Sequence, residues 1–554
     1  MSIAVFISVV TGMGRYSFDR PAWRPQRVSV RRIARGDPGV SVTTRPAMKA
    51  LAAVLVFVLA ACSAGCSTGS RVNLGDESAG NLIAAIAGEP DQLDPQRTSA
   101  YFSFEVLENV FDTLVEPDEN LQMRPALAQS WEVSDDQLTW TFHLRPGVRW
   151  HDGSPLTADD VVYSYRRIID EQLTNVDKFS AVASVTALDP ATVRITVRQP
   201  TPNLLTNLGG FKGMAIVQRA NVESGQIATH PVGTGPFSFV GRKSGDSITL
   251  KANPEYWGGT PPISGVTFRF ISEPTTALSA LQAGEIDWTD SVPPQRVAQL
   301  RDDDSLTLAL TPGNDYWYLA LNEARPPWND PRVRQAIAYS IDRDAIAAAT
   351  SYRTAEVNQL AIPRGSPWFT DYQRYRHDVD RARDLLRQAG AAPRDLDMLV
   401  TSEYPETVTA AQIIADNLAP LGITVNIRTV DFATWLDEQN TGHFDMLMMG
   451  WLGNIDPDDF YYAQHHTNGT SNAQKFSDPE VDRLLDAGRT ETDVAARKEI
   501  YAKAATRIAD QVSYIYLYNP SVIQAWGNNL SGYQVRRDGA VRFRTADLDR
   551  GETR

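Results

Sequence analysis

The chain has 554 residues, of which 42% are hydrophobic and 22% are charged, proportions typical of a globular protein rather than a disordered or fibrous one. Its length exceeds what one hydrophobic core organises and favours two to four domains. The formal net charge of −14 argues against nucleic-acid binding, which depends on Lys and Arg to release counterions from phosphates.

The N-terminal region carries the pattern of an export signal. Lys49 is followed by twelve apolar residues, 50–61, and then by Cys62. A dozen residues are too few to cross a hydrocarbon core of ~30 Å, so this pattern is typical of a secretory signal peptide. The residues LAAC ending at Cys62 are similar to a lipobox, whose Cys is lipidated and becomes the mature N-terminus. Cys66 is the alternative lipidation site, and a plain secreted protein or a buried helix stays open.

The residues before this signal do not fit a signal peptide. Residues 1–47 are rich in Arg, and Met48 makes a better start, so we interpret 1–47 as a mis-assigned start or a disordered segment. A twin-Arg export signal at Arg31 and Arg32 is a second interpretation. Residues 48–61 are then the signal peptide, and residues 62–80 form a small-residue, polar linker.

Cleavage before Cys62 would leave 44 basic and 65 acidic side chains, a net charge of −21. Cys62 and Cys66 are the two cysteines of the chain, so the body has no disulfide, Cys-ligated zinc or thiol chemistry. Lipid chains contribute about 0.8 kcal/mol per buried CH₂. We therefore expect a monomeric body anchored by lipid on the outer face of the cytoplasmic membrane.

The first half of the body alternates between strand and helix patterns. A first strand is expected within residues 81–96, and residues 104–114 keep helical spacing. Residues 140–144 alternate as a strand. Thr157, with Asp160 three positions on, is typical of a capping-box helix start.

The second half continues this alternation. The spacing predicts a strand over 189–200 and a hairpin over 231–252. Asp330 followed by Pro331 indicates a helix start, and a further helix over 378–390 should end at its terminal Gly.

Residues 396–451 are the most informative. Three apolar strand patterns alternate with two helical ones, which predicts a β-α-β-α-β unit with parallel strands and right-handed connections. Ligands in such open sheets lie beyond the carboxyl ends of the strands. The last strand, FDMLMMGW, leads into a loop rich in rings and carboxylates, so a ligand site is expected there.

Several segments together resemble the family 5 extracellular solute-binding proteins of ABC importers, which include dipeptide- and oligopeptide-binding lipoproteins. The resemblance covers roughly residues 82–545 in collinear order. The matching segments are PALAQSWEVSDDQLTWTFHLRPGVRWHDGSPLTADDVVYSY (125–165), PVGTGPF (231–237), NPEYWGG (253–259), ALQAGEID (280–287), YLALN (318–322), DPRVRQAIAYSIDR (330–343) and the GW…DP loop (450–457).

The resemblance implies an α/β, two-lobed fold similar to the type II periplasmic binding proteins, with an additional inserted domain and a double hinge crossing. Ligand would be captured between the lobes by a hinge motion, and the closed form would dock on an ABC permease driven by cytoplasmic ATPases. The implied limits are 81–115, 213–314 and 519–554 for lobe I, 116–212 for the inserted domain II, and 315–518 for lobe II.

The resemblance also implies a site for the ligand amine. Peptide-binding members place an Asp three residues after the Trp of the GW strand, where this chain has Asn454 in a loop one residue shorter. Asp456 is the replacement candidate, because a buried ammonium needs an anionic partner. Its alternative role is to cap the turn before Pro457. Asp458 and Asp459 are expected to be solvated or capping.

Other side chains are expected to form the wall of the cleft. We expect Trp451 and Gly453 from the GW loop, with Asn314, Tyr316 and Trp317 from the start of the second lobe. Trp451 would either face a ligand pocket or fill the core between the lobes.

Some residues near the GW loop are expected to have structural roles. Tyr461 and Tyr462 should pack, and Asp445, inside the strand, should form structural hydrogen bonds. The His465-His466 doublet should be exposed, because neighbouring side chains on extended backbone point apart. Residues 397–412 lack the Arg with which dipeptide binders hold a ligand carboxylate, which favours longer peptides.

The leading hypothesis is therefore a lipid-anchored extracytoplasmic protein that captures short peptides, oligopeptides in preference to dipeptides, and delivers them to an ABC permease. No cofactor, metal or catalytic residue is expected. The alternative is a binder of another solute on the same fold: an oligosaccharide, an opine-like compound, a nickel chelate or haem. A secreted hydrolase is the remote alternative, because the sequence lacks G-x-S-x-G, H-E-x-x-H and a Gly-rich phosphate loop.

Overall fold

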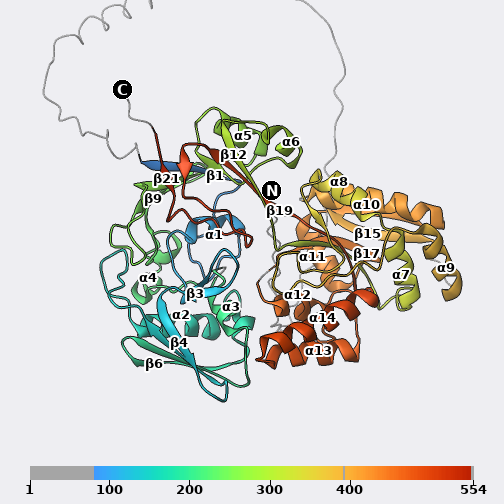
Figure 1. Ribbon diagram of the computed structural model, residues 1–554, viewed down its shortest axis with the longest axis horizontal. Helices are drawn as coiled ribbons and strands as arrows, with labels where there is room; N and C mark the ends of the chain where they lie inside the picture. Colours follow the sequence, from blue (N-terminus) through green and yellow to red (C-terminus); the bar gives the residue numbers. More distant parts are fainter. Residues whose placement is uncertain (1–79, 212, 391–393, 403, 454, 551–554) are drawn as a thin grey trace, which may run out of the picture. The chain divides into compact units, whose positions relative to one another are not determined.

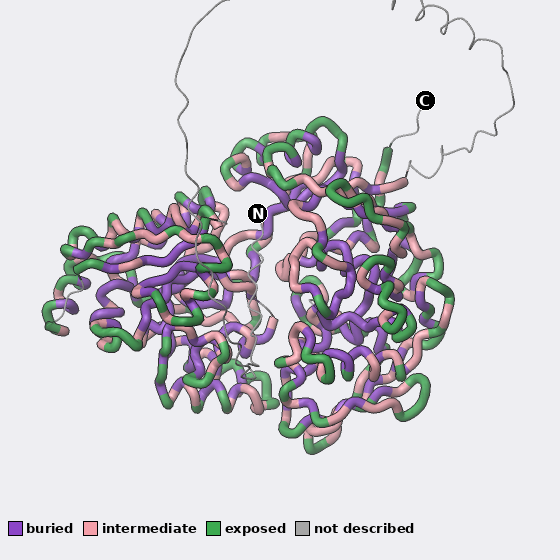
Figure 2. Tube along the Cα trace, turned by 180° about the vertical axis from the view of Figure 1, so that it is seen from behind, coloured by how far each residue is buried: buried purple, intermediate pink, exposed green. Residues whose placement is uncertain are grey.

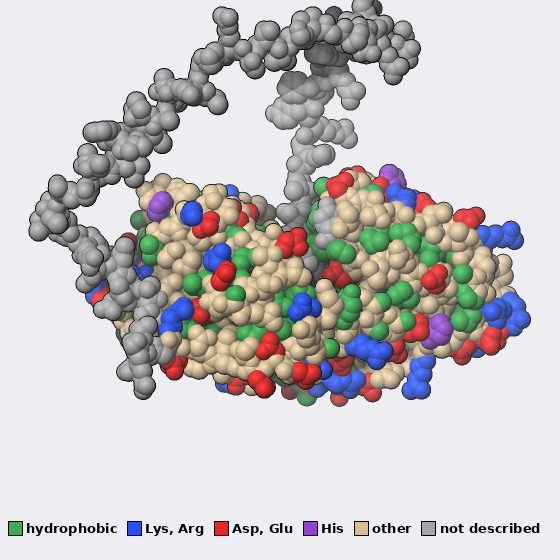
Figure 3. All heavy atoms as spheres, turned by 90° about the horizontal axis from the view of Figure 1, so that it is seen from above, with side chains coloured by type: hydrophobic (Ala, Val, Ile, Leu, Met, Phe, Trp, Pro, Cys, Tyr) green, Lys and Arg blue, Asp and Glu red, His purple; other side chains and the backbone are tan. Residues whose placement is uncertain are grey.

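The computed structural model describes residues 80–211, 213–390, 394–402, 404–453 and 455–550. The lipidation candidate Cys62 and the proposed signal peptide lie outside these ranges. Among the described residues, none of the helices combines the length and apolar character needed to cross a membrane. Figure 3 shows acidic and basic side chains interspersed over the face in view.

The first lobe, as we use the term, is built on a seven-stranded sheet with the order β12-β19-β11-β1-β10-β9-β8 among the described residues. β1 runs parallel to β10 and β11, and the outer pairs are antiparallel. The strands are β1 (Asn81–Ile86), β8 (Phe237–Lys243), β9 (Ser247–Ala252), β10 (Gly265–Phe270), β11 (Trp288–Thr289), β12 (Leu306–Pro312) and β19 (Ser521–Gly527).

The period-two pattern of β1 explains how this sheet is covered on both faces. Leu82, Ala84 and Ile86 point into one core, whereas Ala85 points into a second core with Leu278. The first core includes residues of α1, and the second includes residues of α5 and α6. The helices of the first lobe are α1 (Tyr101–Leu107), α4 (Arg219–Glu223), α5 (Pro274–Gln282) and α6 (Val297–Leu300), with short 3₁₀ turns at Gln226–Ala228 and Pro294–Arg296.

The inserted domain, as we use the term, has an antiparallel sheet with the order β4-β5-β7-β6. Its helix α2 packs on β6 and β7 and begins with the predicted capping box of Thr157 and Asp160. The elements are β4 (Ala128–Val133), β5 (Thr139–Leu144), α2 (Ala158–Asp170), β6 (Val182–Asp189), β7 (Thr192–Val197), α3 (Leu204–Gly209), a 3₁₀ turn η1 (Val176–Phe179) and the nearby pair β2 (Val115–Pro117) and β3 (Met123–Pro125).

The second lobe, as we use the term, is built on a six-stranded sheet with the order β14-β18-β13-β17-β15-β16 among the described residues. β13 is buried on both faces, with Tyr316 and Tyr318 in one core and Trp317 and Leu319 in the other. The strands are β13 (Tyr316–Leu321), β14 (Glu356–Val357), β15 (Asp395–Thr401), β16 (Thr424–Val430), β17 (Met446–Trp451) and β18 (Tyr514–Asn519).

The predicted β-α-β-α-β unit is confirmed in this sheet. β15 pairs in parallel with β16 on one side and with β17 on the other, through α10 (Pro405–Leu418) and α11 (Phe432–Thr441). The remaining helices are α7 (Pro331–Ser340), α8 (Arg343–Ser351), α9 (Val379–Ala389), α12 (Pro457–His465), α13 (Pro479–Thr490) and α14 (Val494–Asp510), with a 3₁₀ turn at Ala419–Leu421.

Neighbouring helices of the second lobe pair closely, α7 with α9 and α13 with α14 (Figure 1). Asp330 caps α7, with its side chain accepting from the Arg332 N–H, and Gly390 ends α9 at φ 66°, as the sequence predicts. Figure 2 shows long buried stretches within the lobes and exposed segments at turns.

One predicted helix is wrong in its length. α1 ends at Leu107, whereas the helical spacing continues to residue 114. Asn109 explains the early end, because its amide donates to the Val541 carbonyl at 2.8 Å and accepts from the Phe543 N–H at 3.0 Å. The apolar residues beyond the helix are still buried, and the carbonyls of Asn109 and Val110 accept from the N–H groups of Phe237 and Gly235 at 3.0 and 2.9 Å. The C-terminal segment that Asn109 contacts also carries β20 (Leu530–Ser531) and β21 (Asp547–Leu548).

Candidate functional site

The chain passes between the two large sheets at two adjacent connections. Residues 313–315 join β12 to β13, and Pro520 joins β18 to β19. The connections bond to each other: the Gly313 N–H donates to the Pro520 carbonyl at 3.0 Å, and Asn519 donates to the Asp315 carbonyl at 2.8 Å. A double connection of this kind allows the lobes to move about one hinge.

A pocket lies at these connections and contains most of the predicted cleft wall. Asn314, Tyr316, Trp317 and Trp451 line it, whereas Gly453 does not. The full lining is Gly313, Asn314, Asp315, Tyr316, Trp317, Gly450, Trp451, Leu452, Pro520, Ser521, Val522, Arg537, Asp538 and Gly539. Residues from both connections, from the end of β17 and from the C-terminal segment therefore meet at one place.

Strand register brings the aromatic residues together. In the antiparallel pair of β13 and β17, Tyr316 lies opposite Trp451, and Trp317 lies opposite Gly450. A side chain at Gly450 would meet the Trp317 ring at 3.3 Å. Trp317 and Tyr316 are buried in the cores on the two faces of the sheet, whereas Trp451 is half-buried.

Gly453 has a structural reason to be glycine. A Cβ at this position would lie 1.7 Å from the Asn314 carbonyl oxygen, and the Gly453 N–H donates to Asp315 Oδ1 at 3.0 Å. The GW loop is thus fixed against the connection between β12 and β13. Asn454, the next residue and a predicted ligand contact, lies outside the described residues.

The carboxylate of Asp456 is fully engaged within the second lobe. Arg497 donates to both of its oxygens at 2.7 Å, and the Asp458 N–H donates to Oδ1 at 3.0 Å. Both side chains of this ion pair are at most 5% exposed. Asp456 also forms the N-cap of α12. This geometry favours the capping role, and amine recognition by Asp456 stays a prediction.

The next two acids of α12 also have basic partners. Asp458 is buried and receives three hydrogen bonds from Arg489, at 3.0 to 3.1 Å, so the expectation that it is solvated is wrong. Asp459 pairs at 3.3 Å with Lys178 of η1 in the inserted domain. Burial raises the pKa of Asp459 to about 6, against the opposing effect of Lys178.

The histidine doublet is not exposed, contrary to the sequence expectation. His465 ends α12 in the core, where its ring nitrogens bond to Ser513 Oγ at 2.8 Å and Tyr516 Oη at 2.7 Å. Burial lowers the pKa of His465 to about 3, so the ring is neutral. The predicted alternation fails because these residues are at the end of a helix rather than on extended backbone. Tyr461 packs in the same core, as expected.

Sequence reasoning missed the contribution of the C-terminal segment. Arg537 lines the pocket and donates to the carbonyls of Pro312, Arg364 and Gly365 at 2.8 to 3.3 Å. It thereby ties the segment after β19 to a loop of the second lobe. No local pattern marks Arg537, because its partners are more than 170 residues away in the chain.

Comparisons with known proteins agree with this architecture. A family model described as "Bacterial extracellular solute-binding proteins, family 5 Middle" matches residues 122–472. The chain is 28% identical to the periplasmic murein peptide-binding protein MppA of Escherichia coli K12, over 83% of this chain and 92% of that one.

Two solved structures show the same fold. The DppA protein of Helicobacter pylori, in complex with the peptide STSA, is 27% identical with a TM-score of 0.73, covering 85% of this chain and 98% of that one. The binding protein AgaA from Agrobacterium tumefaciens R10, in complex with agropinic acid, is 28% identical with a TM-score of 0.74, covering 85% and 99%. Proteins of this fold therefore bind a peptide in one case and agropinic acid in another.

Proposed function

Because the chain belongs to the family 5 bacterial extracellular solute-binding proteins, we propose that it captures short peptides between its lobes and delivers them to an ABC import permease. The observation that carries this proposal is the pocket at the double connection, lined by Trp451 and by segments of both lobes. A ligand held there contacts both sides of the hinge and so favours the closed form.

The lack of an Arg in residues 397–412 supports longer peptides over strict dipeptides, because no carboxylate clamp at that place fixes the ligand length. An extended peptide would be held mainly by backbone hydrogen bonds, which are independent of its sequence. Peptide binding by the similar MppA and DppA proteins supports the same solute class.

The direct test is titration of the purified chain with peptides of two to six residues, followed by calorimetry and tryptophan fluorescence. We expect saturable binding, and Trp451→Ala should weaken it by about 1 kcal/mol or more, as for a buried aromatic anchor. Trp131→Ala, at a half-buried Trp of β4 away from the pocket, is the matched control. Saturable binding of a non-peptide solute alone would replace peptides with that solute.

The second part of the proposal is a lipid anchor at Cys62. Its support is the apolar run that ends in LAAC. Metabolic labelling with a radioactive fatty acid should label the wild type and Cys66→Ala, whereas Cys62→Ala should stay unlabelled and leave the membrane fraction. Label that persists in Cys62→Ala and disappears in Cys66→Ala would move the anchor to Cys66.

A further inference from the structure

The first lobe contains two buried acids that differ from the other buried acids. Glu105 of α1 is 2% exposed, and Asp290, just after β11, is 6% exposed. Each carboxyl affects the pKa of the other, so the two side chains lie close together. Neither forms an ion pair with a Lys or Arg in the part of the chain that the structure describes. Neither Glu105 oxygen accepts a hydrogen bond from an N–H there.

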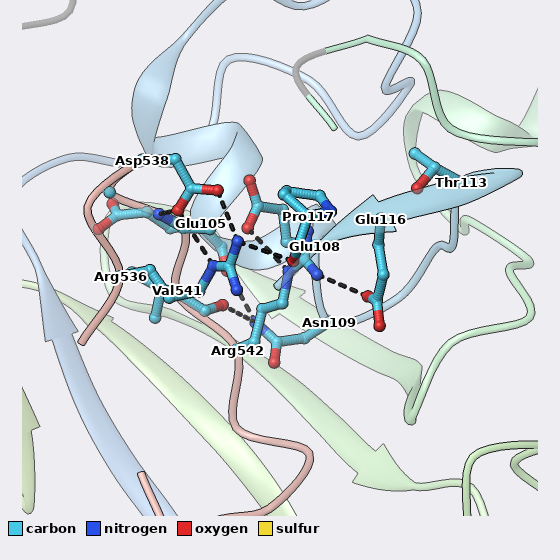
Figure 4. A network of polar contacts seen from close by, with 12 residues as sticks. Glu105, Glu108, Asn109, Thr113, Glu116, Pro117, Arg536, Asp538, Val541 and Arg542 are labelled. Carbon is cyan, nitrogen blue, oxygen red and sulfur yellow. Dashed lines mark hydrogen bonds and ion pairs between the residues drawn. The ribbon is translucent and has the colours of Figure 1, made fainter. Parts of the chain in front are cut away.

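Other acids near this pair, in contrast, have arginine partners. The nearby acids Glu108, Glu116 and Asp538 each have an arginine partner, with Arg542 between Glu108 and Glu116 and Arg536 on Asp538 (Figure 4). Elsewhere, buried Asp94, Asp456 and Asp458 are also paired with arginines. Asp290 accepts from the Ser291 hydroxyl at 3.4 Å. A buried carboxylate without a cation is costly, and two adjacent carboxyls reduce that cost by sharing a proton.

Burial, followed by the neighbouring Asp290 and Glu108, raises the pKa of Glu105 well above its usual value. Burial likewise raises the pKa of Asp290. The raised pKa values favour the protonated form of these two carboxyls.

A second group at the same place lacks a partner. The register pairs Thr289 with Ala525, and Asp290 and Gln524 are the residues next to this pair, just beyond the last paired position of β11. Gln524 is fully buried, and its amide nitrogen has no acceptor among the described residues. Its other end accepts from the Tyr533 hydroxyl at 2.8 Å. The charges of Asp290 and Glu105 act on this same Tyr533.

The sheet topology places these groups near the carboxyl ends of two parallel strands. β1 and β11 are parallel neighbours; α1 follows the carboxyl end of β1, and Asp290 follows that of β11. Ligands of open α/β sheets bind beyond such ends. α1 also reaches the pocket at the connections, since Tyr101, one helical turn before Glu105, donates to the Gly539 carbonyl at 2.9 Å.

We propose that Glu105 and Asp290, on the first lobe, form the site that takes the ammonium group of the ligand. This inference rests on the proposed function for its ligand class. A primary ammonium has three donors and no acceptor, which suits two facing carboxyls. The unpaired Gln524 amide would donate to the carbonyl next to that ammonium. On this proposal the amine is bound by the first lobe, whereas the α12 acids are neutralised by Arg497, Arg489 and Lys178.

The test compares free and N-acetylated peptides. A lysine-free library of tri- to pentapeptides, in both forms, is equilibrated with the full chain, and the retained peptides are quantified by mass spectrometry. We expect the wild type to prefer free amines by about 10- to 100-fold, the range of a hydrogen bond to a charged group. Glu105→Gln and Asp290→Asn, each nearly isosteric, should lose most of this preference and keep their binding of acetylated peptides.

Asp112→Asn is the matched control. Asp112 is a buried acid of the same lobe, and burial raises its pKa too, but it accepts hydrogen bonds from Thr234 and Trp257, so its variant should keep the preference. Equal binding of free and acetylated peptides by the wild type, or an unchanged preference in both variants, would overturn the proposal.

If the wild type binds no peptide, that result counts against the proposed function, and the ammonium site is then tested separately. In that case a thermal-shift panel of amino acids, diamines and amino sugars, each beside its N-acetylated form, decides the question. Stabilisation by free amines that disappears in Glu105→Gln supports the site. Equal shifts from acetylated forms, or no shift from any amine, contradict it.

Discussion

The role of each buried acid in this chain depends on the side chains that it contacts. Asp456 and Glu105 are both buried carboxylates, but Asp456 is held by the buried Arg497, whereas Glu105 faces another carboxyl. Spacing from Trp451 selects Asp456 as a candidate and cannot show Arg497, 41 positions further on. The pairing of Glu105 with Asp290 is equally invisible in sequence, because Glu105 lies on α1 and Asp290 follows β11, far along the chain.

Asp456→Asn should therefore act mainly on stability. Removing one partner leaves the Arg497 charge buried and unpaired, which costs about 3–5 kcal/mol. Denaturant unfolding of the variant should show this loss, and its preference for free-amine peptides should remain. A variant of wild-type stability that loses amine preference would restore Asp456 as the amine site.

Glu105→Gln should change how stability depends on pH. A carboxyl whose pKa is raised on folding stabilises the fold below its unfolded pKa of about 4.3, and that contribution is lost as pH rises through the folded pKa. The variant should therefore be more stable than the ligand-free wild type at pH 8, and the difference should shrink toward pH 4. Asp290, Glu108 and Tyr533 lie near Glu105, so the pH dependence of stability reflects all four groups together. Parallel curves for variant and wild type would contradict this.

At the scale of elements, the sequence predicts what is local. The β-α-β-α-β unit, the capping box of α2 and the Asp330 cap depend on residues within one or two turns of each other, and the structure has them. The helix over 104–114 ends early because Asn109 bonds to a segment more than 430 positions away. The expectation that the histidine doublet is exposed is wrong because His465, at the end of α12, bonds to Ser513 and Tyr516, about 50 positions away in the chain.

The loop between β17 and α12 gives a test at this scale. Gly453→Ala places a Cβ against the Asn314 carbonyl, so the loop must leave its position and we expect ligand binding to weaken at least tenfold. Gly241→Ala, where a Cβ meets nothing within 4 Å, is the matched control and should bind as the wild type does. Calorimetry on both variants decides this, and full affinity in Gly453→Ala would show that the loop does not form the site.

For the whole molecule, the relevant contacts are those that join segments on either side of the hinge. Lys178 and Asp459 link the inserted domain to the second lobe, with 19% and 18% of their side chains exposed. Desolvation offsets much of the attraction within a mostly buried ion pair, and the remaining attraction weakens with salt. We therefore expect this pair to change the free energy of lobe closure only slightly.

Lys178→Met should weaken ligand affinity a few-fold and reduce its salt dependence. The double variant Lys178→Met/Asp459→Asn should bind nearly as the first variant does, because the interaction is already lost. Titrations at low and high salt give the coupling between the two residues. Independent, additive effects would show that the pair does not contribute to closure.

The central claim is that this family 5 protein binds short peptides. The most direct measurement is a native mass spectrum of the chain purified from cells in peptide-rich medium, followed by release and fragmentation of whatever is bound. The account predicts a ladder of extra masses that resolve into peptides with free amino ends. A single non-peptide mass, such as an opine-type acid or a sugar, would contradict the claim and leave the fold unchanged.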